Sequence, residues 1–423
     1  MNRPHFALAF CALAVSSAVA QTQQKVHPPI AQFWMDAATT NMSMPGMEEM
    51  DDMPMLGNMM GNAFGNARSG MSMPGKFLDS ALYTRNKPGG TEGQHGIPVA
   101  MNLGNSLTLL PVQIEKGSGG GGRTEEGELE KPKGRMLFYW GCSETVRAGQ
   151  PRVLDFAKAS FEDYSKFMVG RHAPDRGAKA VPGRSVWPNK LHNQRVPKDA
   201  SLLGEHSMAG DGVPAPWPFV VSGNNDFMTK LRMNAAGDLQ ASVPVTWEGI
   251  DTATGYFMSA MSAREDQDGT PEMILWSSSN EPDPGWGLMA YLTPSRVNQL
   301  IKEKVVLPAD ARKCAVPQGI FGKTEGAMVR MIAYGPELNL AYPPRPTDPK
   351  VDWKPDWAVR LRLKSTSMAM LGQDAAASPA RGGNKASSKA DSSAPQSPSV
   401  PSASDVVKEI VNPVNVLKGL FGR

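Results

Sequence analysis

The sequence predicts a mainly β fold: one or two antiparallel β-sandwich-like domains, a few short helices, and disordered segments at both ends. Three observations lead to this expectation. Short apolar runs recur along residues 76–372, and several show the two-residue alternation of a half-buried strand. Clusters of Gly, Pro and Asn separate these runs at short intervals. Low-complexity composition marks residues 21–75 and 373–403.

The first twenty residues have the pattern of a secretory signal peptide. Arg3 supplies a positive charge, residues 6–19 form an apolar run, and Ala18 and Ala20 give a small-x-small cleavage site. The alternative is a transmembrane helix, but this run is too short to span a bilayer. We therefore expect residues 1–20 to be removed, no transmembrane segment in the mature chain, and a periplasmic or secreted location.

Charge and cysteine content narrow the choice of partners and compartment. Lys and Arg number 44 against 41 Asp and Glu, and this balance provides no basic surface of the kind that binds nucleic acid. Two cysteines, Cys142 and Cys314, remain after the signal. In an oxidising compartment they can form one disulfide. Two buried free thiols are the alternative.

Residues 21–75 form a Met-rich segment of low complexity. Eleven methionines lie between Met35 and Met73, and the pentapeptide Met-Ser-Met-Pro-Gly occurs twice. The start of the segment is different. Phe33, Trp34 and Ala37 suit a short amphipathic helix over residues 30–40 that docks on the body.

Methionine thioether is a soft ligand that suits Cu(I) and Ag(I). The spacing of six methionines lets three sulfurs converge on one ion: Met42, Met44, Met47, Met50, Met53 and Met55. The tract resembles the Met-rich stretches of periplasmic copper-handling proteins, which implies Cu(I) as the one candidate cofactor. It departs from them because no histidine lies between His27 and His95. The alternative is a flexible tract in which methionine only packs loosely on the body.

Residues 76–216 are predicted to form a first β-containing region with long loops. Strands are expected at residues 107–114, 135–140 and 152–156. A helix is expected over residues 160–169, because Ser160 suits the N-cap and Asp163 stands three positions later. Residues 171–216 are rich in Pro, Gly and Asn, and they are expected to be irregular.

Residues 217–372 are predicted to form a β-sandwich-like domain. Strands are expected at residues 219–221, 227–233, 239–247, 255–263, 273–277, 327–333 and 357–364. A helix is expected over residues 293–303, with Thr293 as its cap. The last strand has the cleanest alternation. Its Val359, Leu361 and Leu363 face is expected in the core, and its Arg360, Arg362 and Lys364 face in water.

A short stretch within this domain carries a family resemblance. Val245-x-Trp247 followed by Ala253-Thr254-Gly255-Tyr256 resembles the second and third strands of fibronectin type III-like domains. The resemblance covers residues 245–256 only. It implies that Trp247 and Tyr256 pack on opposite sides of one core, and it implies nothing about function.

No catalytic signature stands out. Residues 319–324 look like a phosphate-binding loop, but Pro317 occupies the position of the required first glycine. His172, His192 and His206 lie in a polar stretch without a nucleophile-elbow serine, which favours ordinary solvated histidines. The carboxylate pairs Glu248 with Asp251 and Glu281 with Asp283 fall in expected turns. Hydrolysis of a glycan would need one of them in an apolar pocket.

The end of the chain has two parts. Residues 373–403 are mostly Ala, Ser, Pro, Gly and Lys, with almost no large apolar residue, and are expected to be a disordered linker. Residues 404–423 are expected to form an amphipathic segment, in which Ile410, Val414, Leu417 and Phe421 share one helical face. This segment is expected to contact the body, an envelope protein, a glycan or a membrane surface.

These observations favour an exported, non-enzymatic, β-rich binding or envelope-associated protein. Two alternatives stay open: a periplasmic protein that binds Cu(I) or Ag(I) through the Met-rich segment, and an envelope glycan hydrolase. Nothing in the sequence identifies the ligand.

Overall fold

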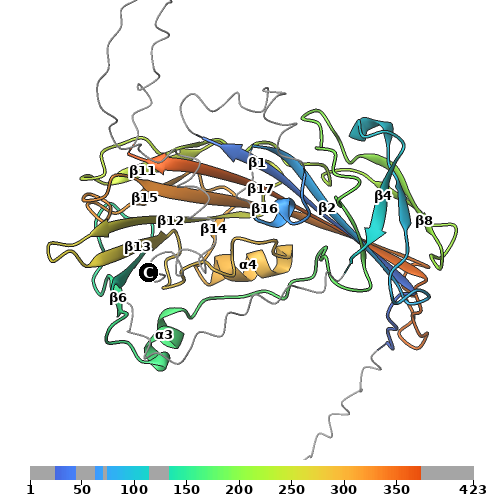
Figure 1. Ribbon diagram of the computed structural model, residues 1–423, viewed down its shortest axis with the longest axis horizontal. Helices are drawn as coiled ribbons and strands as arrows, with labels where there is room; N and C mark the ends of the chain where they lie inside the picture. Colours follow the sequence, from blue (N-terminus) through green and yellow to red (C-terminus); the bar gives the residue numbers. More distant parts are fainter. Residues whose placement is uncertain (1–23, 44–61, 70–73, 114–132, 373–423) are drawn as a thin grey trace, which may run out of the picture.

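The computed structural model describes residues 24–43, 62–69, 74–113 and 133–372 (Figure 1). In these residues the chain is mainly β, as predicted, with 17 strands and three α-helices. The proposed signal peptide, residues 44–61 and 70–73 of the Met-rich segment, the C-terminal linker and the amphipathic segment lie outside the described residues.

Strand β1 (Ala31–Met42) is central to the fold. It pairs in parallel with β17 (Trp357–Leu371) and antiparallel with β2 (Gly75–Thr84). The helix expected over residues 30–40 is therefore wrong. Side chains of β1 are buried on both faces from Met35 to Asn41, and a strand covered on both sides has no polar alternation that would separate it from a helix.

Thirteen strands follow one another in a single large sheet, and a fourteenth pairs with β12. The order from one edge to the other is β6 (Arg152–Asp155), β5 (Arg135–Trp140), β13 (Pro271–Ser277), β12 (Gly255–Glu265), β16 (Ala327–Tyr342), β17, β1, β2, β7 (Ser185–Trp187), β4 (Ser106–Pro111), β3 (Gly93–Gly96), β8 (Gly204–Gly210) and β9 (Pro218–Val221). The additional strand is β14 (Leu307–Pro308). Strands of the two predicted β regions interleave here, because β5 pairs with β13. The edges of the sheet are β6 and β9.

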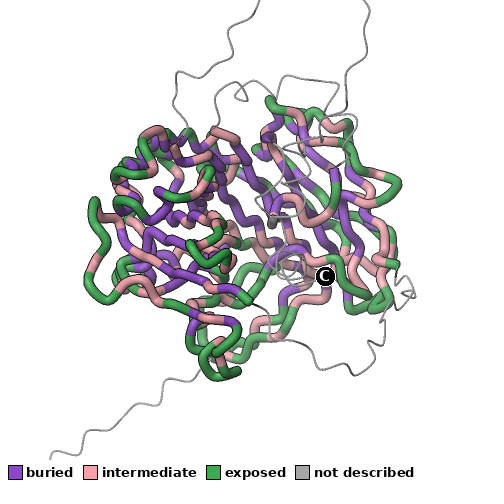
Figure 2. The backbone as a smooth tube through the Cα atoms, turned by 60° about the vertical axis from the view of Figure 1, so that its left-hand side comes forward, coloured by how far each residue is buried: buried purple, intermediate pink, exposed green. Residues whose placement is uncertain are grey.

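A second, three-stranded sheet consists of β10 (Met233–Asn234), β11 (Val243–Trp247) and β15 (Lys313–Val316). It shares one hydrophobic core with the large sheet, and Figure 2 shows buried residues along the strands in the interior of the molecule. Strands β11 and β12 follow each other in sequence but belong to different sheets. The ring centroids of Trp247 and Tyr256 lie 5.5 Å apart between them.

Helices and loops cover the opposite face of the large sheet. Helix α4 (Pro294–Lys302) packs its Val297 and Leu300 against Ile332 and Tyr334 of β16. Its cap is the predicted one, because the Thr293 hydroxyl accepts a hydrogen bond from the Arg296 amide. The other helices are the short α2 (Asn66–Ser69), the 3-10 helix η2 (Val99–Met101) and α3, whose residues are Phe161–Phe167.

Helix α3 (Phe161–Phe167) lies beside the edge strand β6. The predicted pairing of Ser160 with Asp163 is present as a capping box: each side chain accepts a hydrogen bond from the other residue's backbone amide. The helix packs Phe167 against Leu154 of β6 in a small separate core. Local capping and one apolar face therefore place α3 next to the sheet edge.

Two expectations for irregular and extended segments need correction. Residues 171–216 contain strands β7 and β8, which the abundance of Pro, Gly and Asn hid. Residues 227–233 are not a strand over most of their length, since only Met233 belongs to β10. The segment instead lies across the large sheet, where the Thr39 hydroxyl donates to the Met228 carbonyl. Side chains of the large sheet therefore hold this segment in place, and it does not pair with a neighbouring strand over most of its length.

Candidate functional site

Strand β17 differs from its sequence-based prediction in the burial of one face. The face with Arg360, Arg362 and Lys364 was expected in water, but Arg362 is 5% exposed and Lys364 is 0% exposed. The expectation is wrong because α2, the loop before α4 and residues 171–178 lie over this face. The result is a buried ionic cluster, which we define as Asp36, Asp79, Tyr291, Arg362 and Lys364.

Asp36 and Arg362 form the centre of the buried ionic cluster. They are register partners on β1 and β17. Arg362 Nε donates to Asp36 Oδ1 at 2.7 Å, and Nη2 donates to Oδ2 at 2.6 Å. The Ala178 amide adds a third hydrogen bond to Oδ2, at 3.1 Å. Burial lowers the pKa of Arg362, but hydrogen bonds and charge from Asp36 outweigh it, so that the pKa lies above its ordinary value.

Asp79 and Lys364 flank this ion pair. Asp79 is the register partner of Asp36 on β2. Burial raises the pKa of Asp79 to about 7, although the Gly65 amide donates to its Oδ1 at 3.0 Å. Burial, together with the charge of Arg330, lowers the pKa of Lys364 to about 7. An acid and a base in the same cluster therefore titrate near neutral pH.

The segment around α2 closes the cluster through its backbone. Lys364 Nζ donates to the Arg68 carbonyl at 2.7 Å, and the Tyr291 hydroxyl donates to the Ala67 carbonyl at 3.2 Å. Lys364 Nζ also lies 4.7 Å from the centroid of the Tyr291 ring. These charged groups face protein rather than solvent. We therefore assign the cluster to the packing of α2 on the sheet.

Two histidines form a second buried polar pair. His95 Nε2 lies 3.0 Å from His206 Nδ1, and His206 Nε2 lies 2.8 Å from the Leu202 carbonyl. The rings stack on Phe219. Burial lowers the pKa of both histidines. His206 was expected in solvent, but the alternation of β8 turns it inward. The structure brings it together with His95, and not with His172 or His192.

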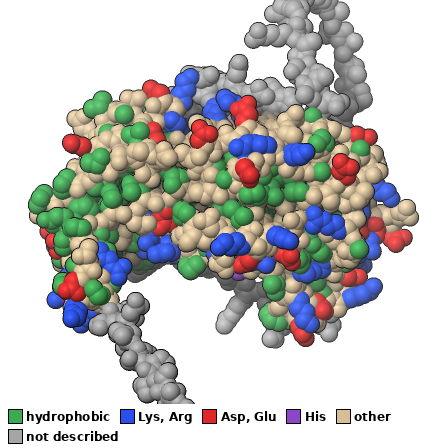
Figure 3. All heavy atoms as spheres, turned by 180° about the vertical axis from the view of Figure 1, so that it is seen from behind, with side chains coloured by type: hydrophobic (Ala, Val, Ile, Leu, Met, Phe, Trp, Pro, Cys, Tyr) green, Lys and Arg blue, Asp and Glu red, His purple; other side chains and the backbone are tan. Residues whose placement is uncertain are grey.

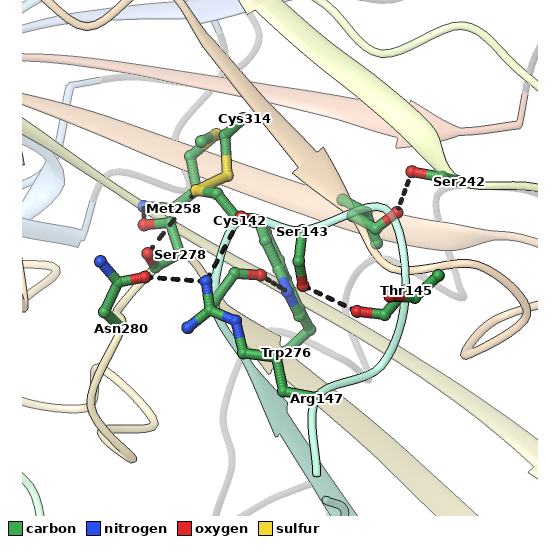
Figure 4. The surroundings of a disulfide bond; sticks show 12 residues. Cys142, Ser143, Thr145, Arg147, Ser242, Met258, Trp276, Ser278, Asn280 and Cys314 are labelled. Carbon is green, nitrogen blue, oxygen red and sulfur yellow. Dashed lines mark hydrogen bonds between the residues drawn. A yellow bond between two sulfur atoms is a disulfide. The ribbon is translucent and has the colours of Figure 1, made fainter.

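Cys142 and Cys314 are joined by a disulfide bond (Figure 4). Cys142 follows β5 of the large sheet, and Cys314 lies on β15 of the small sheet, so the bond links the two sheets. Hydrogen bonds hold the loop around Cys142: the Ser143 amide donates to the Ala315 carbonyl at 3.1 Å, and the Trp276 indole donates to the Gly141 carbonyl at 3.1 Å.

Of the six methionines proposed as metal ligands, only Met42 lies in the described residues, half-buried at the end of β1. The others, Met44, Met47, Met50, Met53 and Met55, lie outside them. In the described part of the chain, no group of three or more His, Cys, Asp or Glu side chains is arranged to hold a metal ion.

The candidate carboxylates are either exposed or paired within the protein. Glu248 and Asp251 are exposed. Asp283 is fully buried and paired: it accepts hydrogen bonds from the amides of Arg171 and Gly285, at 2.8 and 2.9 Å.

An open groove of about 700 Å³ runs between β6 and α3. We call it the β6–α3 groove. Its apolar lining is Val153, Leu154, Ala159, Phe167, Val169 and Pro282, and its charged lining is Arg152, Asp155, Lys158, Asp163 and Lys166. Three large apolar side chains with exposed surface gather on these elements: Val153 at 51%, Phe161 at 88% and Val169 at 63%. The groove therefore has exposed apolar side chains beside an apolar lining.

The backbone of β6 leaves part of its hydrogen-bonding capacity open to this groove. The Phe156 amide donates to the Gly134 carbonyl at 3.0 Å, which fixes residues 152, 154 and 156 as the positions bonded to β5. Because bonding alternates along an antiparallel strand, Val153 and Asp155 direct their backbone groups toward the open edge. The Ala159 amide bonds the Asp155 carbonyl at 2.8 Å. The Val153 amide and carbonyl and the Asp155 amide remain directed outward. The sequence predicts the strand β6 and the helix α3 separately, and no signal in it indicates the groove between them.

Charges of both signs are interspersed over the face seen in Figure 3. Among the described residues, none of the helices has the length and hydrophobicity needed to cross a membrane. No protein-family model matches the chain, and no curated protein matches it.

Proposed function

We propose that this chain is an exported, non-enzymatic protein of the cell envelope whose β-rich body binds an extended polypeptide segment in the β6–α3 groove. The observation that carries the proposal is the combination of an open sheet edge with an apolar groove. Extended peptides bind such sites by adding a strand: main-chain hydrogen bonds give affinity, and side-chain pockets give specificity.

The geometry of the groove favours a strand over other ligands. The outward amide and carbonyl of Val153 match the repeat of an added antiparallel strand. Phe167 and Val169 provide an apolar wall for alternate side chains of that strand. The charged residues lie around this apolar lining and include both signs, an arrangement typical of protein-binding surfaces.

Two observations support the exported location. Residues 1–20 have the composition of a signal peptide. The pairing of Cys142 with Cys314 fits an oxidising compartment, since disulfides are rare in cytosolic proteins.

Selection from a library of displayed random peptides, with the mature protein as the target, tests the binding function. The key variant is Val153→Pro, which removes an outward amide at an edge position, where proline is tolerated. The matched control is Val220→Pro on the opposite edge, β9. The Met208 amide bonds the Trp217 carbonyl, which by alternation turns the Val220 amide outward in the same way.

Peptides selected on the mature protein should lose at least tenfold in affinity for the Val153→Pro variant and keep their affinity for Val220→Pro. Peptides that bind all three proteins equally would contradict the proposal, as would a failure to select any peptide both on the mature protein and on the same chain ending at residue 403.

A second proposal concerns the Met-rich segment, which we suggest binds Cu(I) or Ag(I). The spacing of its thioethers supports this idea. The part of the segment that holds five of the six candidate ligands, residues 44–61, is flanked by two points held on the body: the Ser43 amide donates to the Met368 carbonyl at 2.7 Å, and the Asn62 amide donates to the Asn193 carbonyl at 3.2 Å. Fixed ends limit the entropy that the segment loses when it closes around an ion.

A further inference from the structure

We infer that the occupant of the β6–α3 groove is the C-terminal segment of the same chain, residues 404–423, added as a strand to β6. This inference rests on the proposed function of the groove and names its ligand. The C-terminal segment then fills the groove, and an external peptide has to displace this segment before it can bind.

The composition of the segment suits a strand. Six of the eleven residues from Val406 to Val416 are Val or Ile, and β-branched side chains favour strands over helices. Pro413 lacks an amide, which an edge strand tolerates and a helix interior does not. The helical arrangement of Ile410, Val414, Leu417 and Phe421 is therefore the less favoured one.

The described chain ends at a point from which this segment can reach β6. Strand β17 ends at Leu371, beside Met370. A row of register partners runs from there to the sheet edge: Met370, Met328, Met261, Leu275, Phe138 and Arg152. Five strand spacings of about 4.8 Å separate the ends of this row, which makes about 24 Å.

The linker has the length that this distance requires. Residues 373–403 are Ala, Ser, Pro and Gly-rich, and a flexible chain of this length spans on the order of 30 Å. The effective concentration of a tethered ligand is highest when the average span of its linker matches the distance to the site. The linker therefore favours docking on β6 of the same molecule.

The groove offers the segment an apolar contact surface. Val153 and Val169 are more than half exposed in the described residues, although both line the groove. Covering them with Val and Ile side chains would remove this apolar surface from water. The backbone groups of Val153 would complete their hydrogen bonds in the same step.

Hydrogen exchange followed by mass spectrometry tests the inference on three proteins: the mature chain, the same chain ending at residue 403, and the mature chain with Val153→Pro. The outward amides of Val153 and Asp155 should exchange at least tenfold more slowly in the mature chain than in the truncated one, whereas the amides at positions 152, 154 and 156 are bonded to β5 in both. A synthetic peptide of residues 404–423 should bind the truncated protein and restore this protection. It should bind the mature chain only weakly, because the tethered segment already occupies the groove.

Two further variants show whether a loss of peptide binding comes from the groove or from misfolding. Val169→Asp places a charge in the groove at an exposed position and should abolish binding of the synthetic peptide. Val220→Pro on β9 should leave it unchanged. Equal exchange in the mature and truncated chains, with no binding of the synthetic peptide, would overturn the inference.

Other outcomes separate this inference from the proposed function. If the truncated protein binds display-selected peptides but not the 404–423 peptide, the groove keeps its function and the C-terminal segment is not its ligand. Protection that appears only with dimer formation would assign the groove to the segment of a second copy and overturn docking within one molecule. Vesicle binding by the mature chain, without protection of β6, would also overturn it.

Discussion

Asp36 and Arg362 form a two-hydrogen-bond ion pair across the parallel strands β1 and β17, with side chains that are 1% and 6% exposed. The two residues stand 326 positions apart in the chain. The pair therefore connects the start and the end of the described body.

We expect Asp36→Asn to destabilise the protein by about 3–5 kcal/mol, because it leaves the buried Arg362 charge with only the partly exposed Asp175, 3.8 Å away. Urea unfolding measures this change. The double variant Asp36→Leu with Arg362→Met should recover most of the loss, since apolar replacement removes both charges together. Asp352→Asn, in an exposed pair with Lys25, is the control and should have little effect. A single variant as stable as the wild type would show that the pair contributes little.

Asp79 should make stability depend on pH between about 4 and 7. Its pKa in the folded protein is about 7, against an ordinary value of 3.8 for an aspartate in water. The folded state therefore holds a proton that the unfolded state releases as the pH rises above 3.8. The stabilisation from this group is complete below pH 3.8 and is lost as the pH rises through 7, to a total of about 4 kcal/mol.

The variant Asp79→Asn isolates this effect, because the amide oxygen can still accept the hydrogen bond from Gly65. Relative to the wild type, it should gain stability steadily from pH 4 to pH 7 and then remain level. Denaturant unfolding at several pH values measures the difference. The exposed variant Asp251→Asn controls for general charge effects. A difference that stays constant across this range would contradict a raised pKa for Asp79.

The disulfide is expected to contribute about 5 kcal/mol to stability. Its two cysteines are 172 residues apart, and in the chain-entropy model the stabilisation grows with the length of the closed loop. Thiol titration of the unfolded, unreduced protein should find no free thiol. A reducing agent should lower the urea midpoint of the wild type but not that of a Cys142→Ala, Cys314→Ala variant. Two free thiols in the unreduced protein would contradict the bond.

The sequence predicted local features better than the contacts between distant segments. The caps of α3 and α4 were predictable because Ser160, Asp163 and Thr293 act within one helical turn. The alternation of β17 correctly predicted a strand. It could not show that Arg362 and Lys364 are buried, because their partners come from β1 and from the loop that carries Tyr291.

The groove shows the same limit. Strand β6 and helix α3 were both expected, and nothing in their own residues indicates that β6 is an edge. That property follows from β5 pairing with β13, whose residues lie more than 130 positions later in the chain. The prediction of a helix in place of β1 failed for a related reason. Protein covers both faces of this strand, which removes the polar alternation on which a strand prediction depends.

The Met-rich segment is expected to bind Cu(I) in preference to Cu(II) or Zn(II). Eight methionines lie between Met42 and Met60, and thioethers select soft ions, whereas imidazoles and thiolates are missing from this interval. The acids Glu48, Glu49, Asp51 and Asp52 add negative charge near the sulfurs. Because thioethers do not titrate, Cu(I) binding should persist at mildly acidic pH, unlike binding by a histidine site.

Competition against a Cu(I) chelator, at neutral and mildly acidic pH, tests this expectation on the mature protein. A variant with Leu at positions 44, 47, 50, 53 and 55 is the main comparison, because Leu keeps the apolar character and removes the sulfur. Met42 is kept in this variant, because its side chain is half-buried in β1 and its replacement could disturb the strand. The wild type should withdraw Cu(I) from the chelator at both pH values, and the five-site variant should not. Equal and weak competition by both proteins would leave the segment as a connection between β1 and α2 with no role in metal binding.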